Sequence, residues 1–239
     1  MARKFQYISL IPIYLLVLVL VSVTAMTANH AITAAVENTP INDRVCVIID
    51  PGHGGIDGGA ISCNGNLESH INLEISMRLD DLMHLLGIQT IMTRKSDISI
   101  HTAGESIAQK KVSDLKHRVK IVNDTPNALL ISIHQNQFTD RKYSGAQVFY
   151  AATQDSKALA VQLQENFKLN LNSKSKRQAK KADGVYLMQN INCTGVLVEC
   201  GFLSNYEEEA KLREAAYQKR ICSIIATTTS QYLNSRAVA

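Results

Sequence analysis

The sequence predicts a single α/β domain with a mostly parallel or mixed central sheet and helices on both faces. Short β-branched runs, such as residues 45–49 and 128–133, alternate with segments whose apolar residues recur at helical spacing. Strands that alternate with helices are typical of a sheet covered on both sides. From Val45 onward the chain has roughly 195 residues, which is enough for one domain with a substantial core.

The elements are expected in a regular order. The first strand, residues 45–49, is almost continuously apolar, as in a central strand buried on both faces. A helix begins at Glu68 and ends before Gly87, because apolar residues recur every three or four positions between them. Further strands are predicted at 88–92, 128–133, 146–150, 185–188 and 195–198, further helices around 115–122, 159–167 and 221–233, and a polar surface excursion at 96–113.

Residues 1–28 are expected to be a signal peptide or an uncleaved N-terminal anchor. Arg3 and Lys4 form a basic start, and residues 10–21 are an apolar block of 12 residues. That length suits a signal-peptide core better than a membrane span, which needs about 20 apolar residues. With either outcome the body of the protein is exported, residues 29–44 are a linker, and residues 45–235 are the folded domain.

Charge and cysteine content exclude two classes of protein. The net charge of +4 falls to +2 once Arg3 and Lys4 are removed, which is too weakly basic to indicate a nucleic-acid partner. A basic cluster is expected to be a solvated helix end or loop, with contact to an anionic polymer as the alternative; its members are Lys174, Lys176, Arg177, Lys180 and Lys181.

The five cysteines do not form a disulfide scaffold, because their number is odd. Cys193 and Cys200 flank one predicted strand and therefore lie roughly 20 Å apart, beyond the reach of about 7 Å that a disulfide allows. Cys46 and Cys200 are expected to be small buried hydrophobic residues. None of the five has zinc-ligand spacing.

Three polar residues are expected to meet at the carboxyl ends of the strands, where open α/β sheets bind ligands. A glycine-rich turn presents His53 after the first strand, Glu68 opens the next helix, and His134 ends a later strand. Two imidazoles and a carboxylate suit zinc and leave one coordination position open for water. Asp57 could orient the His53 ring without itself binding the metal. The alternative for His53 alone is a residue that only shapes the turn.

Glu199 closes the strand at 195–198 and is a fourth candidate residue of the site, and the four residues together indicate a hydrolase. Its alternative is a structural ion pair with Arg94 or Arg118. A carboxylate after an apolar strand is costly to bury without a partner or a task. The remaining histidines have no second ligand at suitable spacing, although His101 in the polar excursion could reach a substrate; the others are His30, His70, His84 and His117.

Several motifs, in order, carry a family resemblance. They are the Asp-Pro-Gly-His-Gly-Gly turn at 50–55, Glu68 with Asn72 and Leu73, Met-Thr-Arg at 92–94, Arg118 with Asn123, Ser-Ile-His-Gln-Asn at 132–136, and the segment 199–205. Over nearly all of residues 45–233 the chain resembles the zinc-dependent N-acetylmuramoyl-L-alanine amidases. The resemblance implies that His53, Glu68 and His134 bind zinc and that Glu199 is the catalytic carboxylate.

Such enzymes cleave the amide between muramic acid and the stem-peptide L-alanine of peptidoglycan, so residues 45–235 would be the zinc amidase catalytic domain. This sequence departs from the usual pattern at Gln135, Gln137 and Cys200, none of which is an acid, base or ligand of the site. Two alternatives stay open: a non-catalytic peptidoglycan-binding module, and a zinc hydrolase acting on another cell-wall amide. Intact Glu199 beside three intact ligands argues against the binding module.

A narrower resemblance is to the single-domain sporulation amidases of endospore formers, which residues 144–150 and 185–188 also match. It implies action in the spore cortex on the way to muramic-δ-lactam, and a location in the cell wall or on the outer side of the membrane, in the forespore intermembrane space. The implied partners are peptidoglycan and an activator or accessory protein. No nucleic acid is expected, and a membrane only through an uncleaved leader.

Overall fold

The computed structural model describes residues 16–24 and 45–237. Residues from Val45 onward form one compact unit, and residues 16–24 are helical. Most of the predicted leader and the whole of the predicted linker, residues 29–44, lie outside the described residues. Within the described ranges, no helix is both long enough and apolar enough to cross a membrane.

A six-stranded mixed sheet forms the centre of residues 45–237, in the order β2-β1-β3-β6-β4-β5. The strands are β1 (Cys46–Pro51), β2 (Gln89–Met92), β3 (Ala128–Asn136), β4 (Gln147–Tyr150), β5 (Lys180–Lys181) and β6 (Thr194–Phe202). Strands β2, β1, β3 and β6 run parallel, whereas β4 is antiparallel to β6. The predicted fold class is therefore confirmed, with a mixed rather than purely parallel sheet.

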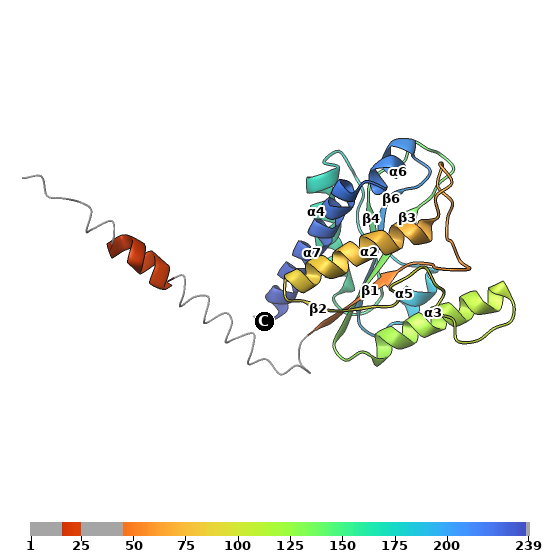
Figure 1. Ribbon diagram of the computed structural model, residues 1–239, viewed down its shortest axis with the longest axis horizontal. Helices are drawn as coiled ribbons and strands as arrows, with labels where there is room; N and C mark the ends of the chain where they lie inside the picture. The colour runs from red at the N-terminus through yellow and green to blue at the C-terminus, as the bar shows by residue number, and fades with distance from the viewer. Residues whose placement is uncertain (1–15, 25–44, 238–239) are drawn as a thin grey trace, which may run out of the picture. The chain divides into compact units, whose positions relative to one another are not determined.

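Helices cover both faces of the sheet (Figure 1). They are α2 (Glu68–Leu85), α3 (Ile107–Asp124), α4 (Ser156–Leu171), α5 (Tyr186–Asn190), α6 (Tyr206–Leu212) and α7 (Ala215–Ala237). Helices α2, α4 and α7 pack together over one face, and α3 and α5 pack over the other. Successive residues of β1 belong to the two different core clusters, as expected of a strand buried on both faces.

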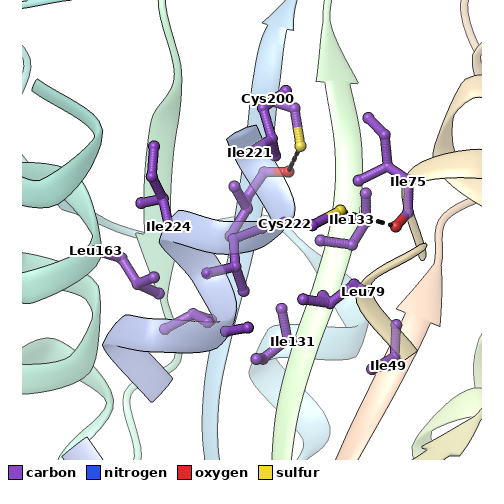
Figure 2. Close-up of a cluster of buried hydrophobic side chains, with 14 of the residues drawn as sticks. Ile49, Ile75, Leu79, Ile131, Ile133, Leu163, Cys200, Ile221, Cys222 and Ile224 are labelled. Carbon is purple, nitrogen blue, oxygen red and sulfur yellow. Dashed lines mark hydrogen bonds between the residues drawn. The ribbon is translucent and has the colours of Figure 1, made fainter. Parts of the chain in front are cut away.

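The larger core cluster fixes the position of the central strands. Ile49, Ile131 and Ile133 of β1 and β3 are fully buried. They face Ile75 and Leu79 of α2 in the apolar layer that Figure 2 shows. Because these strands are held from both sides, the polar residues at their carboxyl ends are held in fixed positions as well.

One predicted element type and one predicted boundary are wrong. The apolar run at 185–188 is not a strand: Val185 is the N-cap of helix α5, whose Leu187 and Met188 pack on the α3 side of the sheet. A run this short cannot be assigned by periodicity alone. The polar excursion predicted at 96–113 is shorter than expected, because α3 begins at Ile107 behind a capping box.

Helix α6 was not expected at all. Its N-cap is Asn205, which accepts a hydrogen bond from the Glu208 backbone N–H. The cysteine prediction is confirmed, because all five cysteines are free thiols and Cys46 and Cys200 are buried.

Candidate active site

The sequence-predicted site residues gather at the carboxyl edge of the parallel strands. His53 follows β1, Glu68 is the first residue of α2, and His134 lies near the end of β3. Glu199 of β6 is the register partner of His134 in the neighbouring strand. Four positions spread over nearly 150 residues of chain thus converge on one edge.

A carboxylate lies between two imidazoles. The Glu68 Oε2 atom is 3.2 Å from His53 Nε2, and its Oε1 atom is 2.9 Å from His134 Nδ1. The two rings meet edge to face, with centroids 5.0 Å apart. One ligand atom from each residue can be chosen so that all three lie within 4.8 Å of one another, so these residues could hold a single metal ion.

The Glu68 carboxylate is held by the backbone as well as by the imidazoles. It accepts hydrogen bonds from the backbone N–H groups of Ala60 at 3.0 Å and Gln135 at 3.1 Å, and from the Asn72 side-chain amide at 3.2 Å. Burial alone raises the pKa of Glu68, but its bonds to the two imidazoles outweigh burial and lower that pKa. Glu68 therefore stays ionised, as a metal ligand must.

His53 stands in the left-handed region of the backbone map, with φ of 60°. Arg118 donates a hydrogen bond of 2.7 Å to the His53 carbonyl and so helps to hold this sparsely populated conformation. The Asp57 carboxylate is 2.9 Å from His53 Nδ1, as expected for a residue that orients the ring. Burial lowers the pKa of His53, but Glu68 and Asp57 together raise it to about 9.

Two glycines make room for the side chains of His53, Glu68 and His134. A Cβ atom on Gly52 would lie 2.2 Å from the His134 ring, and one on Gly59 would lie 2.7 Å from both Glu68 Oε2 and the His53 ring. Gly59 also has φ of 71°, which side chains rarely adopt. Any side chain at Gly52 or Gly59 would thus occupy the space that these three side chains need. We call this part of the turn the glycine cradle.

A buried ionic network holds the glycine-rich turn in place. Arg118 is 2.5 Å from Asp50 and 2.6 Å from Asp114. Arg94 donates to the carbonyls of Pro51 and Gly52. Neither arginine pairs with Glu199, so the alternative of a structural ion pair for that carboxylate is wrong.

Glu199 differs from every other acid at this edge. Its Oε2 atom is enclosed and has no hydrogen-bond partner among the described residues. Burial raises the pKa of Glu199 to about 7, reinforced by the Glu68 charge and opposed by the imidazoles. A carboxylate whose pKa is close to neutrality is suited to accept and release protons.

The other histidines do not join the site. Each has a partner outside it: His70 binds Asp97, His84 binds Thr90, His101 binds Ser99, and His117 binds the Ile100 carbonyl. His30 lies outside the described residues. The role of Asn72 on the Glu68 carboxylate was missed, although its position one helical turn after Glu68 places both on the same face of α2.

Comparisons with known proteins show the family of the chain. A family model described as N-acetylmuramoyl-L-alanine amidase matches residues 47–230. A germination-specific N-acetylmuramoyl-L-alanine amidase of Bacillus subtilis is 37% identical over 199 residues, which are 82% of this chain and 83% of that protein. The amidase AmiA of Escherichia coli is 28% identical over 79% of this chain and 76% of its own length.

Solved structures show the same architecture. The CwlD amidase of Clostridioides difficile, solved in complex with the GerS lipoprotein, superposes with a TM-score of 0.77 at 37% identity and covers 80% of this chain and 100% of its own. A second amidase structure from Clostridium difficile has a TM-score of 0.69 at 28% identity, over 81% of this chain and 98% of its own. The chain belongs to the N-acetylmuramoyl-L-alanine amidases, a family of cell-wall hydrolases.

Proposed function

We propose that this amidase is zinc-dependent and that His53, Glu68 and His134 hold the metal. The observation that carries the proposal is the carboxylate fixed between two imidazoles inside a glycine cradle. The donor set is two nitrogens and one oxygen, which suits zinc and leaves a coordination position open. Asp57 behind His53 and Asn72 beside Glu68 supply the outer hydrogen bonds that orient such ligands.

The scissile bond in this proposal is the amide between muramic acid and the stem-peptide L-alanine. Zinc, when bound, supplies a Lewis acid for the attacking water and the amide carbonyl. Glu199 accepts a proton from that water and donates it to the leaving alanine nitrogen. Its free, enclosed Oε2 atom and its pKa of about 7 suit a group that must do both near neutral pH.

The biological setting we propose is the spore cortex, where the reaction leads to muramic-δ-lactam. Its support is the similarity to a germination-specific amidase and to CwlD. Residues 1–28 would serve as the export signal or anchor, which places the enzyme outside the membrane in the forespore envelope. Because the Clostridioides difficile structure holds a lipoprotein partner, we also propose that an accessory protein acts with this chain.

The metal assignment is tested by elemental analysis of protein purified without chelator. About one zinc per chain is expected for the wild type, and His53→Ala or His134→Ala should remove most of it. His70→Ala is the matched control, because His70 is exposed and binds Asp97 outside the site. Normal zinc content in both site variants would overturn the assignment.

The reaction is tested by digesting purified peptidoglycan with and without zinc. An amidase releases stem peptides that have a free N-terminal alanine, whereas a deacetylase releases acetate. Binding to peptidoglycan with no product at all would identify a binding module instead. In the cell, deletion of the gene should leave vegetative growth normal and give spores that lack muramic-δ-lactam and germinate poorly.

A further inference from the structure

A basic groove lies beside the candidate active site, on the β4 side of β6. Its volume is about 540 Å³. Four cationic side chains line it together with an aromatic ring and an amide; these residues are Lys142, Lys176, Arg177, Lys180, Tyr143 and Gln147. We refer to it below as the basic groove.

The sheet register places the basic groove next to Glu199. Gln147, which lines the groove, is the register partner of Glu199 across β4 and β6. Farther along β6, the Arg177 guanidinium lies 4.8 Å above the Phe202 ring, and the Tyr143 ring stacks 6.3 Å from it. One lining residue of the groove, Gln147, is thus one strand away from Glu199.

Two of the four cations of the basic groove, Lys176 and Lys180, have no carboxylate partner among the described residues, whereas Lys142 pairs with Asp140 from outside the groove and Arg177 lies near the Glu208 carboxylate. None of the described residues that line the groove is acidic. Glu208 nearby is buried and accepts hydrogen bonds from two backbone N–H groups. Lys176 and Lys180 are exposed, and in the described part of the chain no carboxylate forms an ion pair with either.

Arg177 is fixed in place. Besides its contact with Phe202, its guanidinium donates to the Ser144 carbonyl at 3.3 Å and to Gln147 Oε1 at 3.5 Å. An arginine held in this way loses less conformational freedom when an anion binds. One anchored cation flanked by two free lysines is suited to an extended ligand that carries more than one carboxylate.

We propose that the basic groove binds the carboxylates of the stem peptide on the leaving-group side of the scissile amide. This inference rests on the proposed function, because that function defines the substrate. In the uncut substrate the sugars and the scissile amide are neutral, whereas the stem peptide carries free carboxylates beyond its first alanine. The groove thus sets the direction in which the substrate lies. The stem peptide runs over β4, and the glycan extends away from β4.

The test compares two double variants that remove the same charge. Lys176→Gln with Lys180→Gln neutralises the two free lysines of the groove. Lys174→Gln with Lys181→Gln neutralises two lysines of the same segment that do not line it, one of which pairs with Asp183. A change caused only by net charge would appear equally in both, because their long-range fields are similar.

Binding of the free acidic stem peptide is measured by calorimetry, which needs no catalytic turnover. The groove variant should bind it about five- to tenfold more weakly at low salt, as expected from the loss of two exposed charge contacts. The control variant should bind like the wild type. A peptide whose carboxylates are converted to amides should bind all three proteins equally weakly.

The same substitutions are then measured in cleavage of a soluble muropeptide. The groove variant should raise KM by about the same factor and leave kcat within about twofold, because the two lysines bind the substrate without contacting the reacting amide. Equal peptide binding in all three proteins would overturn the groove proposal, even if cleavage proceeds. If both double variants instead lose only retention on whole cell walls, the cluster binds an anionic wall polymer and the proposal is wrong.

Failure of the proposed function would look different. If the wild-type protein with zinc cleaves no muropeptide but its peptide binding depends on Lys176 and Lys180, the groove assignment stands and the catalytic assignment falls.

Discussion

Two carboxylates at the same edge of the sheet, one fully buried and one half-buried, have opposite properties. Asp50, at the end of β1, accepts hydrogen bonds from Thr93 at 2.7 Å, Ser132 at 2.8 Å and Arg118 at 2.5 Å. Burial acts to raise the pKa of Asp50, but these partners outweigh it and lower that pKa. Glu199 has an enclosed oxygen with no partner, and its pKa is raised to about 7.

The difference shows that partners, rather than burial, decide what a buried acid can do. Both carboxylate oxygens of Asp50 accept hydrogen bonds, so its proton affinity is low and it helps to fix the turn before His53. No such donor faces the Oε2 atom of Glu199 among the described residues, so the protonation of Glu199 costs little free energy. A buried polar atom without a partner in a native structure calls for an explanation, and the proton-transfer role that we propose for Glu199 supplies one.

Glu199→Gln should have the largest effect. The substitution keeps the side-chain shape and removes the proton acceptor, so kcat should fall by about 10² to 10⁴. Zinc content should stay at the wild-type level, and the free energy of unfolding should stay equal or rise, because an unpaired buried acid is lost. Glu214→Gln, at an exposed position, is the control. Activity within a few-fold of wild type would mean that another group is the base.

Asp50→Asn should act on stability instead. It leaves the Arg118 guanidinium buried and short of one anionic partner, which typically costs about 3 to 5 kcal/mol of unfolding free energy. Because the folded-state pKa of Asp50 lies below its unfolded value, its contribution is present above about pH 4 and is lost as the pH falls further. Chemical denaturation of metal-free protein at several pH values should show the two proteins converging in acid. A constant difference down to the lowest pH would contradict this reading.

Asp57→Asn tests the hydrogen bond that orients a proposed ligand. Asp57 holds His53 Nδ1, and loss of such an outer contact typically weakens metal affinity by about 10- to 100-fold. Competition with a chromogenic zinc chelator measures the change. The variant also loses the ion pair with Lys111, so Lys111→Gln is the matched control and should keep most of the affinity. Equal losses in both would assign the effect to the ion pair.

The sequence was sufficient to bring the four candidate residues together. His53, His134 and Glu199 lie at the carboxyl ends of parallel strands, which meet whatever the loop lengths between them, and Glu68 opens the helix that follows the glycine-rich turn. The sequence was not sufficient for α5, since a five-residue helix and a short buried strand present the same apolar run. It could not separate Lys176 and Lys180 from Lys174 and Lys181 either. Which lysines line the groove depends on the path of the segment past Phe202, and that path is set by tertiary contacts.

We expect the smallest effects on stability from the removal of single hydroxyl groups. Two such groups compare a buried hydroxyl that has a hydrogen-bond partner with one that has none. Ser132 donates to Asp50, so Ser132→Ala should destabilise the fold by about 1 to 2 kcal/mol by leaving a charged acceptor short of a donor. Ser76 is also fully buried, but its Oγ atom has no partner among the described residues. It lies within α2, where alanine has the higher helix propensity, so Ser76→Ala should be neutral or stabilising by about 0.5 kcal/mol. Chemical denaturation of both variants at pH 7 measures the two changes in the free energy of unfolding. Equal destabilisation would mean that burial, rather than a hydrogen-bond partner, decides how much these hydroxyls contribute to stability.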